Sequence, residues 1–418
     1  MKADNPVVRE IRFLSRQPFA LLLIIIAAIL SAIAVWSGVT ETRHQQSIIE
    51  RLLVADAEDR AAAIAKEADY GGAAYYAFHL TYDPPSSLAF ASIGERDVFP
   101  WKHRIRMLAL EGQIYESDAA NAELAQSGRL DFTFVISVLA PLFLIVLLHD
   151  QRAAERMAGR YDLLVATAGS DNQPWRMRAV IRIALLSIAL LAPFLVGTVV
   201  TGAGFVSVLL VCAVVLAQIL FWSLLCVWAS ARGFTGPTIT SGLLAVWLLT
   251  TFIVPSVGDA VLENSIQAPD GGDIVLAQRE AVNDAWDLPK EVTMEPFIAR
   301  HPEWSAYATI ERPFEWKWYY AFQQVGDQTV EEISEKRRAA ISKRYLTAGW
   351  IALLSPSSLT KRALSRLAQT DVRAALSYQQ NIRDYHARLR QFYYPLLFTS
   401  ADYEQDVLAK LPEYKPEE

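Results

Sequence analysis

The chain has 418 residues, 53% of them hydrophobic, yet it carries 39 basic and 45 acidic side chains. The apolar residues lie in a few uninterrupted blocks with the charges between them, which argues against one soluble globular domain and is typical of a membrane protein. The net charge of -6 averages segments that face different solvents. Cys212 and Cys226 lie in one apolar block about 21 Å apart along a helix, too far to form a disulfide with each other.

The first apolar block runs from Phe19 to about Trp36 and carries no charge. We interpret it as the first membrane span, because it is longer than the core of a signal peptide and no small-residue cleavage site closes it; a cleaved signal peptide is the alternative. Basic residues precede the block, and the positive-inside rule then places the N-terminus in the cytoplasm. These residues are Lys2, Arg9, Arg12 and Arg16.

Four further apolar blocks predict four more spans. With the first span at residues 19–37, the others cover residues 132–148, 179–201, 205–230 and 238–258. Short connections make the last three spans antiparallel neighbours. Alternation places residues 38–131 and 259–418 outside and residues 149–178 in the cytoplasm, and the five arginines of that loop agree with a cytoplasmic face.

The outer segments carry helical patterns. Apolar residues repeat at helical spacing from Ile48 to Leu53, and an Ala- and charge-rich run follows to Ala68, so we expect the first span to continue out of the membrane as an amphipathic helix. Residues 327–346 and 359–392 have the same character. The predicted fold class is predominantly α: a polytopic membrane bundle with a large, mainly helical extracytoplasmic domain in two parts.

The sequence lacks the common catalytic and nucleotide-binding motifs. It contains no phosphate-cradling P-loop, no HExxH and no GxSxG, and its six histidines are scattered. We therefore nominate no catalytic, cofactor-binding or metal-binding residue and expect a protein that is not an enzyme. The apolar blocks have no ionisable residue in their interiors, and Arg182, near the start of the third, is expected to extend to the interface. This argues against a self-powered secondary transporter and suggests that a partner supplies the energy.

The segment between the second and third spans turns into a mixed-charge helix at residues 150–170. An apolar stripe of three residues and four charged side chains give this helix two different faces. The residues are Leu163, Leu164 and Val165, and Glu155, Arg156, Arg160 and Asp162. A partner that pushes on a helix anchored between two spans would tilt both spans, so a lever is one interpretation and a solvated linker helix is the other.

The pattern Glu155-x-x-x-Gly159 followed by Leu163-Leu164 resembles the cytoplasmic loop of ABC-2 type transporter permeases. In that family the loop contains the coupling helix that docks on the ATPase subunit, so the resemblance implies an ATPase interface. The implied interface comprises Glu155, Arg156, Gly159, Arg160, Asp162, Leu163 and Leu164. The stretch VREIRFLSRQP, which ends at Pro18, resembles the family's amphipathic interface helix, here residues 1–18. Its charged residues are Arg9, Glu10, Arg12 and Arg16.

Five motifs in or beside the outer segments resemble one branch of these permeases, which carries a large extracytoplasmic domain of unassigned function. They are SIGERDVFPW (92–101), GRLDFTFV (128–135), PLFLIVLLHD (141–150), LLSPSSL (353–359) and YHARLRQFYYPLLF (385–398). The resemblance implies a bacterial inner-membrane protein that works with a cytoplasmic ABC ATPase dimer, a second permease subunit, identical or not, and membrane lipid. A periplasmic partner fits the outer domain, and nucleic acid is not expected. ATP and magnesium would bind the ATPase, with no cofactor in this chain.

Two features leave alternatives open. ABC-2 permeases have six spans, whereas the later apolar run YLTAGWIALLSP, at residues 345–356, is too short to cross a bilayer. Either the sequence stops before a sixth span or the chain has five. A motif of Gly94, Arg96, Asp97 and Pro100 is expected to fix a loop through an Arg–Asp ion pair, with ligand contact as the alternative.

The sequence thus predicts a permease subunit that couples ATP hydrolysis by a partner ATPase to movement of an unidentified cargo across or out of the inner membrane. One alternative is mechanotransmission to a periplasmic or outer-membrane partner without solute transport. A second is a membrane-anchored enzyme, which would require a cluster of ionisable side chains with perturbed pKa values in the outer domain.

Overall fold

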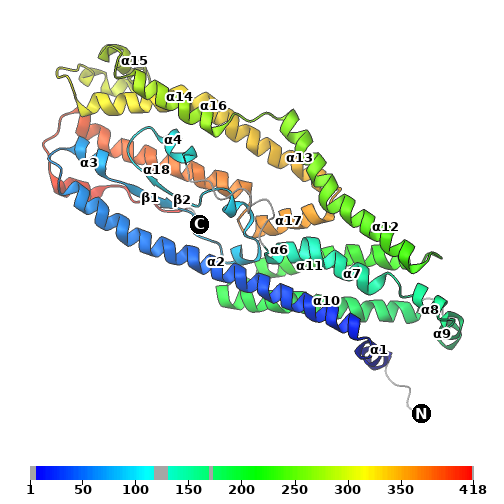
Figure 1. Cartoon of the computed structure of the whole chain (residues 1–418). Helices are drawn as coiled ribbons and strands as arrows, with labels where there is room; N and C mark the ends of the chain where they lie inside the picture. Colours follow the sequence, from blue (N-terminus) through cyan, green and yellow to red (C-terminus); the bar gives the residue numbers. More distant parts are fainter. Residues whose placement is uncertain (1–5, 117–129, 169–172, 417–418) are drawn as a thin grey trace.

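The computed structural model describes residues 6–116, 130–168 and 173–416 and places them in two regions, a bundle of long apolar helices and a mainly helical domain beyond its end (Figure 1). The predicted fold class is confirmed, because the chain is mostly helical and five helices among the described residues are long and apolar enough to cross a membrane. These candidate spans are Pro18–Ile64, Phe132–Met157, Gln173–Thr201, Phe205–Ser230 and Gly236–Ser265.

Helix α2 (Pro18–Ile64) follows α1 (Pro6–Ser15) and continues unbroken from the bundle into the domain (Figure 1). It begins with Pro18, whose fixed φ and missing N–H suit the first helical position. Its 47 residues correspond to roughly 70 Å at the rise of an α-helix. The prediction that the first span and the segment to residue 64 form one helix is therefore confirmed.

Helices α10 (Gln173–Thr201) and α11 (Phe205–Ser230) form the third and fourth spans, and α10 packs along α2. Ala27 and Ala34 of α2 are fully buried, and their small side chains let the two helices approach closely. Ser31, between them, donates a 2.7 Å hydrogen bond to the carbonyl of Leu190 in α10. A polar side chain inside the bundle is thus satisfied by the neighbouring span.

The second and fifth spans each contain a π-helical turn. The second consists of α6 (Phe132–Phe134), η3 (Val135–Leu139), α7 (Ala140–Leu148) and α8 (Ala153–Met157), and the fifth of α12 (Gly236–Leu248), η4 (Leu249–Ile253) and α13 (Val254–Ser265). Pro141 and Pro255 stand shortly after the two π turns. A proline cannot donate to the carbonyl four residues earlier, so each helix shifts its hydrogen bonding and opens a carbonyl to another partner.

The domain is built from both outer segments. The first supplies the outer half of α2, α3 (Tyr70–Tyr76), the antiparallel strands β1 (His79–Tyr82) and β2 (Lys102–Ile105), the 3-10 turns η1 (Ala89–Ala91) and η2 (Gly94–Asp97), and α4 (Leu110–Tyr115). The second supplies α14 (Gly271–Asp284), α15 (Lys290–Arg300), η5 (Pro302–Tyr307), α16 (Trp316–Ala352), α17 (Pro356–Leu367), α18 (Val372–Phe398) and η6 (Gln405–Lys410). In the sheet, His79 lies opposite Ile105.

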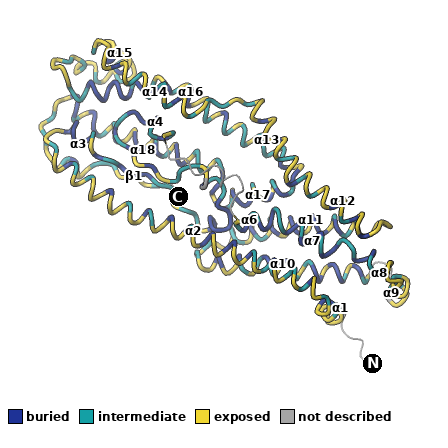
Figure 2. The backbone as a smooth tube through the Cα atoms, viewed as in Figure 1, coloured by how far each residue is buried: buried dark blue, intermediate teal, exposed yellow. Residues whose placement is uncertain are grey.

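The bundle and the domain have separate hydrophobic cores. Figure 2 shows buried positions along the inner side of both regions. The domain core is rich in aromatic residues, among them the fully buried Phe297, Tyr320 and Tyr393. The hydroxyl of Tyr320 donates a 2.9 Å hydrogen bond to the carbonyl of Gly71, so this core also ties the C-terminal helices to the segment after α2.

A close contact joins the two regions where α2 leaves the bundle. Phe90 of η1 stacks on Phe194 of α10, which in turn stacks on Phe132, with ring centroids 5.8 and 4.9 Å apart. Gly38 of α2 lies against the backbone of Phe90, and a Cβ at this position would come within 1.9 Å of the Phe90 carbonyl oxygen. Only glycine fits here without movement of the backbone.

Candidate functional site

The loop predicted to form one charged helix forms two short helices instead. Helix α8 ends at Met157, and α9 (Tyr161–Ala168) begins after Gly159, whose φ is +68°. Two backbone hydrogen bonds of 3.0 Å close the end of α8 in the pattern of a Schellman cap. Gly159 ends the helix because it adopts a left-handed conformation that side chains disfavour. Residues 169–172 of the predicted loop lie outside the described residues.

Glu155 is the centre of an ion-pair cluster at this end of the bundle. It is 5% exposed, and its carboxylate accepts hydrogen bonds from Arg160 at 2.8 Å and from Arg178 at 3.2 Å. Arg178 also lies 3.6 Å from the carboxylate of Glu10 in α1. Because two arginines compensate its buried charge, Glu155 faces the chain's own side chains rather than the surface. This Glu155 cluster ties α1, the loop and the third span together.

Aromatic rings and guanidinium groups extend the Glu155 cluster. Tyr161 stacks on Trp175 with ring centroids 5.5 Å apart and planes 8° apart. Arg156 lies 4.7 Å from the centre of the Tyr161 ring, and Arg178 lies 4.5 Å from that of Phe13. These contacts hold α9 and α1 against the start of α10.

The opposite side of α8 and α9 is exposed. Met157 is 79% exposed and Leu163 is 66% exposed, while Leu164 is half-buried. We call Met157, Asp162 and Leu163 the α8–α9 face. Figure 1 places α1, α8 and α9 together at the end of the bundle that is farthest from the domain. The remaining residues of the predicted interface that are exposed are Arg9, Arg12, Arg16, Arg156, Gly159 and Arg160, and Glu10 is half-buried.

Arg182 lies inside the bundle. It is 7% exposed, and its guanidinium group donates to the carbonyl of Leu147 in the second span and, at 2.7 Å, to the side-chain oxygen of Gln17 just before α2. Gln17 precedes the first span and Leu147 lies near the end of the second, so the expectation that Arg182 extends to the interface stays a prediction. Arg182 therefore links the third span to the end of the second span and to the residue before the first.

The Ser92–Trp101 motif packs between α2 and the turn that joins α17 to α18. Gly94 has a φ of +59°, and a Cβ there would lie 2.3 Å from the carbonyl oxygen of Thr370. Arg96 is 9% exposed, donates to Gln45 of α2 at 3.1 Å and pairs with Asp83. Arg96 of the motif thus forms an Arg–Asp ion pair, as expected. Its partner, however, is Asp83, which lies outside the motif in the loop after β1. The side chain of Asp97 lies outside the described residues.

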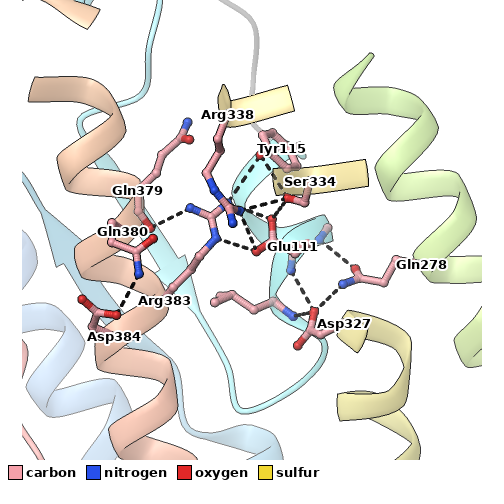
Figure 3. A network of polar contacts seen from close by, with 12 residues as sticks. Glu111, Tyr115, Gln278, Asp327, Ser334, Arg338, Gln379, Gln380, Arg383 and Asp384 are labelled. Carbon is pink, nitrogen blue, oxygen red and sulfur yellow. Dashed lines mark hydrogen bonds and ion pairs between the residues drawn. The ribbon is translucent and has the colours of Figure 1, made fainter. Parts of the chain in front are cut away.

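A cleft in the domain gathers charged side chains from both outer segments. It has a volume of ≈ 360 Å³. Figure 3 shows Glu111 of α4 between arginines of α16 and α18, with an aspartate of α16 beside it. We call the five charged residues at its base the cleft cluster. They are Glu111, Asp327, Arg338, Arg383 and Arg390.

Both acids of the cleft cluster are fully engaged by the chain. Arg383 donates to the two carboxylate oxygens of Glu111 at 2.5 and 2.8 Å, and Ser334 donates to the same carboxylate at 2.5 Å. Asp327 accepts from Arg390 at 2.5 Å and, through its other oxygen, from the side chain of Gln278 at 2.6 Å. That oxygen also accepts from two backbone amides at the start of α4. The cluster therefore fastens α4 to α14, α16 and α18.

Burial and charge act differently on the two acids. Burial favours a higher pKa for Glu111, but the hydrogen bonds and charge of Arg383 outweigh it and hold the pKa below its usual range. For Asp327, burial dominates and raises the pKa despite the opposing charge of Arg390. Two acids with separated pKa values are a feature of acid–base sites. Here every carboxylate oxygen already has a protein donor, so the arrangement suits a structural cross-link better than proton transfer.

The rim of the cleft combines charge with an aromatic edge. Arg300 and Glu331 form an ion pair at 2.5 Å, and the imidazole of His301 lies 3.0 Å from the carboxylate of Glu303. Trp304 stacks on Phe398 with ring centroids 5.3 Å apart. The cleft lining includes four arginines and four acidic residues. Most of these charges are paired with one another within the chain.

No local pattern in the sequence predicts the contacts of the cleft cluster. Glu111 and Arg383 are separated by 272 positions, and neither lies in a motif with a known spacing. Arg178 is one of the five arginines of the loop at residues 149–178, and nothing local to it indicates a buried partner at Glu155. Both clusters exist because the fold brings distant segments together.

Residues 274–417 match the family model described as a domain of unknown function, DUF3526. The match covers most of α14 and all of α15 to α18, so it includes four members of the cleft cluster, whereas Glu111 lies in the earlier outer segment. The chain matches no curated protein and no solved structure. It is a multi-span helical membrane protein that carries a DUF3526 domain.

Proposed function

We propose that the chain is the permease subunit of an ABC-2 type transporter in a bacterial inner membrane, with its N-terminus in the cytoplasm. A separate ABC ATPase dimer would bind the α8–α9 face, hold ATP and magnesium, and drive movement of a cargo, with a second permease subunit completing the assembly. The chain itself would not be an enzyme. The proposal rests on the Glu155 cluster, which ties an exposed apolar face to α1 and to the third span.

A force applied at the α8–α9 face has a direct route into the bundle. The bonds of Glu155 join the face to Arg178 at the start of α10. One helical turn further on, Arg182 joins α10 to the first and second spans. Removal of one partner from a buried ion pair costs about 3–5 kcal/mol, so these links resist small displacements. A push on Leu163 is therefore expected to move α10 and α2 together.

Mechanotransmission without solute transport is the second candidate. The observation that favours it is α2, one helix of 47 residues that passes from the bundle into the domain. A rigid helix of this kind can carry a displacement to a periplasmic partner. The two candidates differ in proteoliposomes that contain the purified complex, because mechanotransmission predicts ATP turnover with no accumulation of cargo.

The membrane-anchored enzyme has less support. The cluster of ionisable groups that it requires is present in the cleft, with the pKa values of Glu111 and Asp327 shifted in opposite directions. Both carboxylates, however, are held by arginines and other donors of the chain. A general acid or base needs a free position for substrate, and the cleft cluster offers none on these two acids.

Site-specific photocrosslinking tests the docking role of the α8–α9 face. With p-benzoylphenylalanine in place of Leu163, irradiation of native membranes should yield an adduct with a protein that contains a P-loop. The matched control is Val199, which is 83% exposed on the third span and should face lipid. An adduct with the same protein from both positions, or adducts with lipid alone from Leu163, would contradict docking at this face.

A substitution tests whether the contact transmits energy. Leu163→Asp places a charge on the apolar part of the face and should lower the ATP turnover of the purified complex severalfold, whereas Leu163→Met keeps the apolar contact and should not. Leu163 is 66% exposed, so neither change disturbs the bundle. Equal turnover of the two variants would argue against coupling through Leu163.

A further inference from the structure

The end of α16 and the start of α17 carry an apolar surface outside the five spans. Five large side chains are exposed within fourteen residues. They are Leu346 (51%), Trp350 (76%), Leu353 (59%), Leu354 (69%) and Leu359 (44%). Burial of one such side chain is worth about 1.5–3 kcal/mol, so a stripe of this kind is costly to leave in water. A contiguous patch of this size on a protein surface indicates a partner.

The exposed residues at the end of α16 and in the turn after it follow a helical spacing. Leu346 and Trp350 of α16, and Leu353 and Leu354 of the turn, are spaced at i, i+4, i+7 and i+8. The opposite side packs on the fifth span, where Gly258 leaves room for Ile351: a Cβ on Gly258 would lie 2.7 Å from the Ile351 side chain. The stripe therefore faces away from the protein.

Contacts between α16, α17 and the fifth span show how far this segment descends beside the spans. Arg344 donates at 2.7 Å to the carbonyl of Ile266, just after the end of the span at Ser265. Ile351 meets Gly258, and Ser357 accepts a 3.0 Å hydrogen bond from Thr251. From Gly258 to Thr251 the span advances about 10 Å. The turn before α17 thus lies well within the length of the fifth span.

The fourth span gives the same depth. Thr360 of α17 donates at 3.1 Å to the side-chain oxygen of Gln218. Gln218 is roughly 20 Å along α11 from its first residue, Phe205, which is near the middle of that helix. Contacts with both the fifth and the fourth spans therefore place the start of α17 within the bundle.

The polar groups at the tip of this hairpin are matched to the spans. Ser355 caps α17 by accepting from the amide of Ser358 at 3.1 Å, and Pro356 occupies the first helical position. Ser357 donates at 2.7 Å to the carbonyl of Ser137. Pro141 has no N–H for that carbonyl, so the π turn of the second span provides an acceptor for Ser357. Polar groups at membrane depth require such partners.

Basic and aromatic residues mark the level where the segment would leave the hydrocarbon. Lys343 is exposed one turn before Leu346. Arg362 of α17 lies 3.6 Å from the centre of the Tyr345 ring and donates to the Tyr345 carbonyl at 2.8 Å. Lys, Arg, Tyr and Trp are the residues that anchor helices at the membrane–water interface. Along α16, Lys343 and Tyr345 come before Trp350, which is the order expected for a helix that enters lipid.

We propose that residues 346–359 form a re-entrant hairpin that enters the bilayer from the domain side and turns back without crossing it, with lipid acyl chains against Trp350, Leu353 and Leu354. Lipid is the occupant because the stripe is continuous in depth with the exposed surface of the fifth span, where Val257 is 57% exposed. The run YLTAGWIALLSP, too short to span, is long enough for this role. The proposal requires the five spans and is independent of any ATPase.

Nitroxide collision measurements test the hairpin. In a background with Cys212→Ala and Cys226→Ala, single cysteines at Leu354, Leu209, Val98 and Lys343 are spin-labelled in the full-length protein, reconstituted in phosphatidylethanolamine–phosphatidylglycerol vesicles. Leu209 is 57% exposed on the fourth span and Val98 is 63% exposed in the domain. At Leu354, collisions with oxygen should exceed those with a water-soluble nickel chelate severalfold, as at Leu209, and the ratio should be reversed at Lys343 and Val98.

Two outcomes would overturn the proposal. A ratio at Leu354 like that at Val98 would place the hairpin in water. Low collision rates with both reagents at Leu354 would show that protein, such as a second copy of the chain, covers the stripe. Leu353, 59% exposed on the same face, provides a second labelling position, so that poor folding of the Leu354 variant does not prevent a decision.

Discussion

At the scale of single residues, two buried histidines give the domain a pH dependence. His79 in β1 and His103 in β2 are 1% and 8% exposed. Burial lowers the pKa of His79 to about 3, with a contribution from the charge of Arg60, and lowers the pKa of His103 to about 4. Nε2 of His103 lies 3.3 Å from the carbonyl of Ile114, so it must carry the proton and donate. Nδ1 then accepts from the hydroxyl of Tyr378 at 3.1 Å, and the neutral ring satisfies both partners.

The His103→Gln variant isolates this effect. Because the folded pKa of His103 is depressed, the unfolded chain binds more protons below pH 6.5, and the stabilisation present above that pH is lost as pH falls toward 4. The wild-type protein should therefore lose about 1.4 kcal/mol per pH unit relative to His103→Gln between these limits. Burial raises the pKa values of Asp83 and Glu95, but both proteins share these groups. Thermal unfolding in detergent at several pH values measures the difference, and a difference that does not change with pH would contradict the assignment.

At the scale of elements, local patterns predict the long helices and miss the interruptions. The apolar block after Phe19 and the helical spacing from Ile48 predict α2 as one helix, and the structure has one. The segment 150–170 forms two helices because Gly159 caps the first. The positive φ of this glycine ends the helix, and the apolar pattern does not reveal it. Residues 345–356 show the same limit, because length excludes a span but does not indicate that the segment enters the bundle beside one.

The contact of α2 with η1 depends on one glycine. In Gly38→Ala, the new Cβ would lie 1.9 Å from the Phe90 carbonyl oxygen, so backbone must move, at a cost of about 1–3 kcal/mol. Gly242 of α12 is the matched control, since a Cβ there meets nothing within 4 Å. Gly242→Ala should leave stability unchanged or raise it by up to about 1 kcal/mol through helix propensity. Thermal midpoints of the two variants in detergent test this, and equal midpoints would show that the joint tolerates a side chain.

At the scale of the whole molecule, composition predicts the membrane bundle, whereas the domain's charged cleft depends on the tertiary fold. Each span is a continuous apolar run, so its environment is encoded locally. The bonds of Glu111 to Arg383 and of Asp327 to Arg390 join residues from different helices and, for Glu111, from different outer segments. No spacing rule relates such positions. The sequence predicts that the two outer segments are helical parts of one domain, and their packing shows which side chains join them.

The packing of distant segments also constrains the topology. Glu111 lies after the first span and Arg383 after the fifth, and their 2.5 Å contact requires both segments to be on one side of the membrane. At the other end, Arg156, in the last turn of the second candidate span, donates at 3.4 Å to the carbonyl of Arg232, so the end of the second span and the loop after the fourth share the opposite side. An alternating path through five spans satisfies both contacts, and a path in which any one of the last four candidates alone fails to cross does not.

Cysteine labelling from each side of the membrane tests this arrangement. In a background without Cys212 and Cys226, Val98→Cys and Leu276→Cys represent the domain, and Met157→Cys and Leu163→Cys represent the α8–α9 face; these positions are 63%, 65%, 79% and 66% exposed. A membrane-impermeant maleimide should label the first pair in intact spheroplasts and the second pair only in inverted vesicles, because the arginine-rich loop favours the cytoplasm. Labelling of Val98→Cys and Leu276→Cys from opposite sides would contradict the conclusion that the two outer segments form one domain. Labelling of all four from the same side would require an even number of crossings between them, which the five-span path forbids.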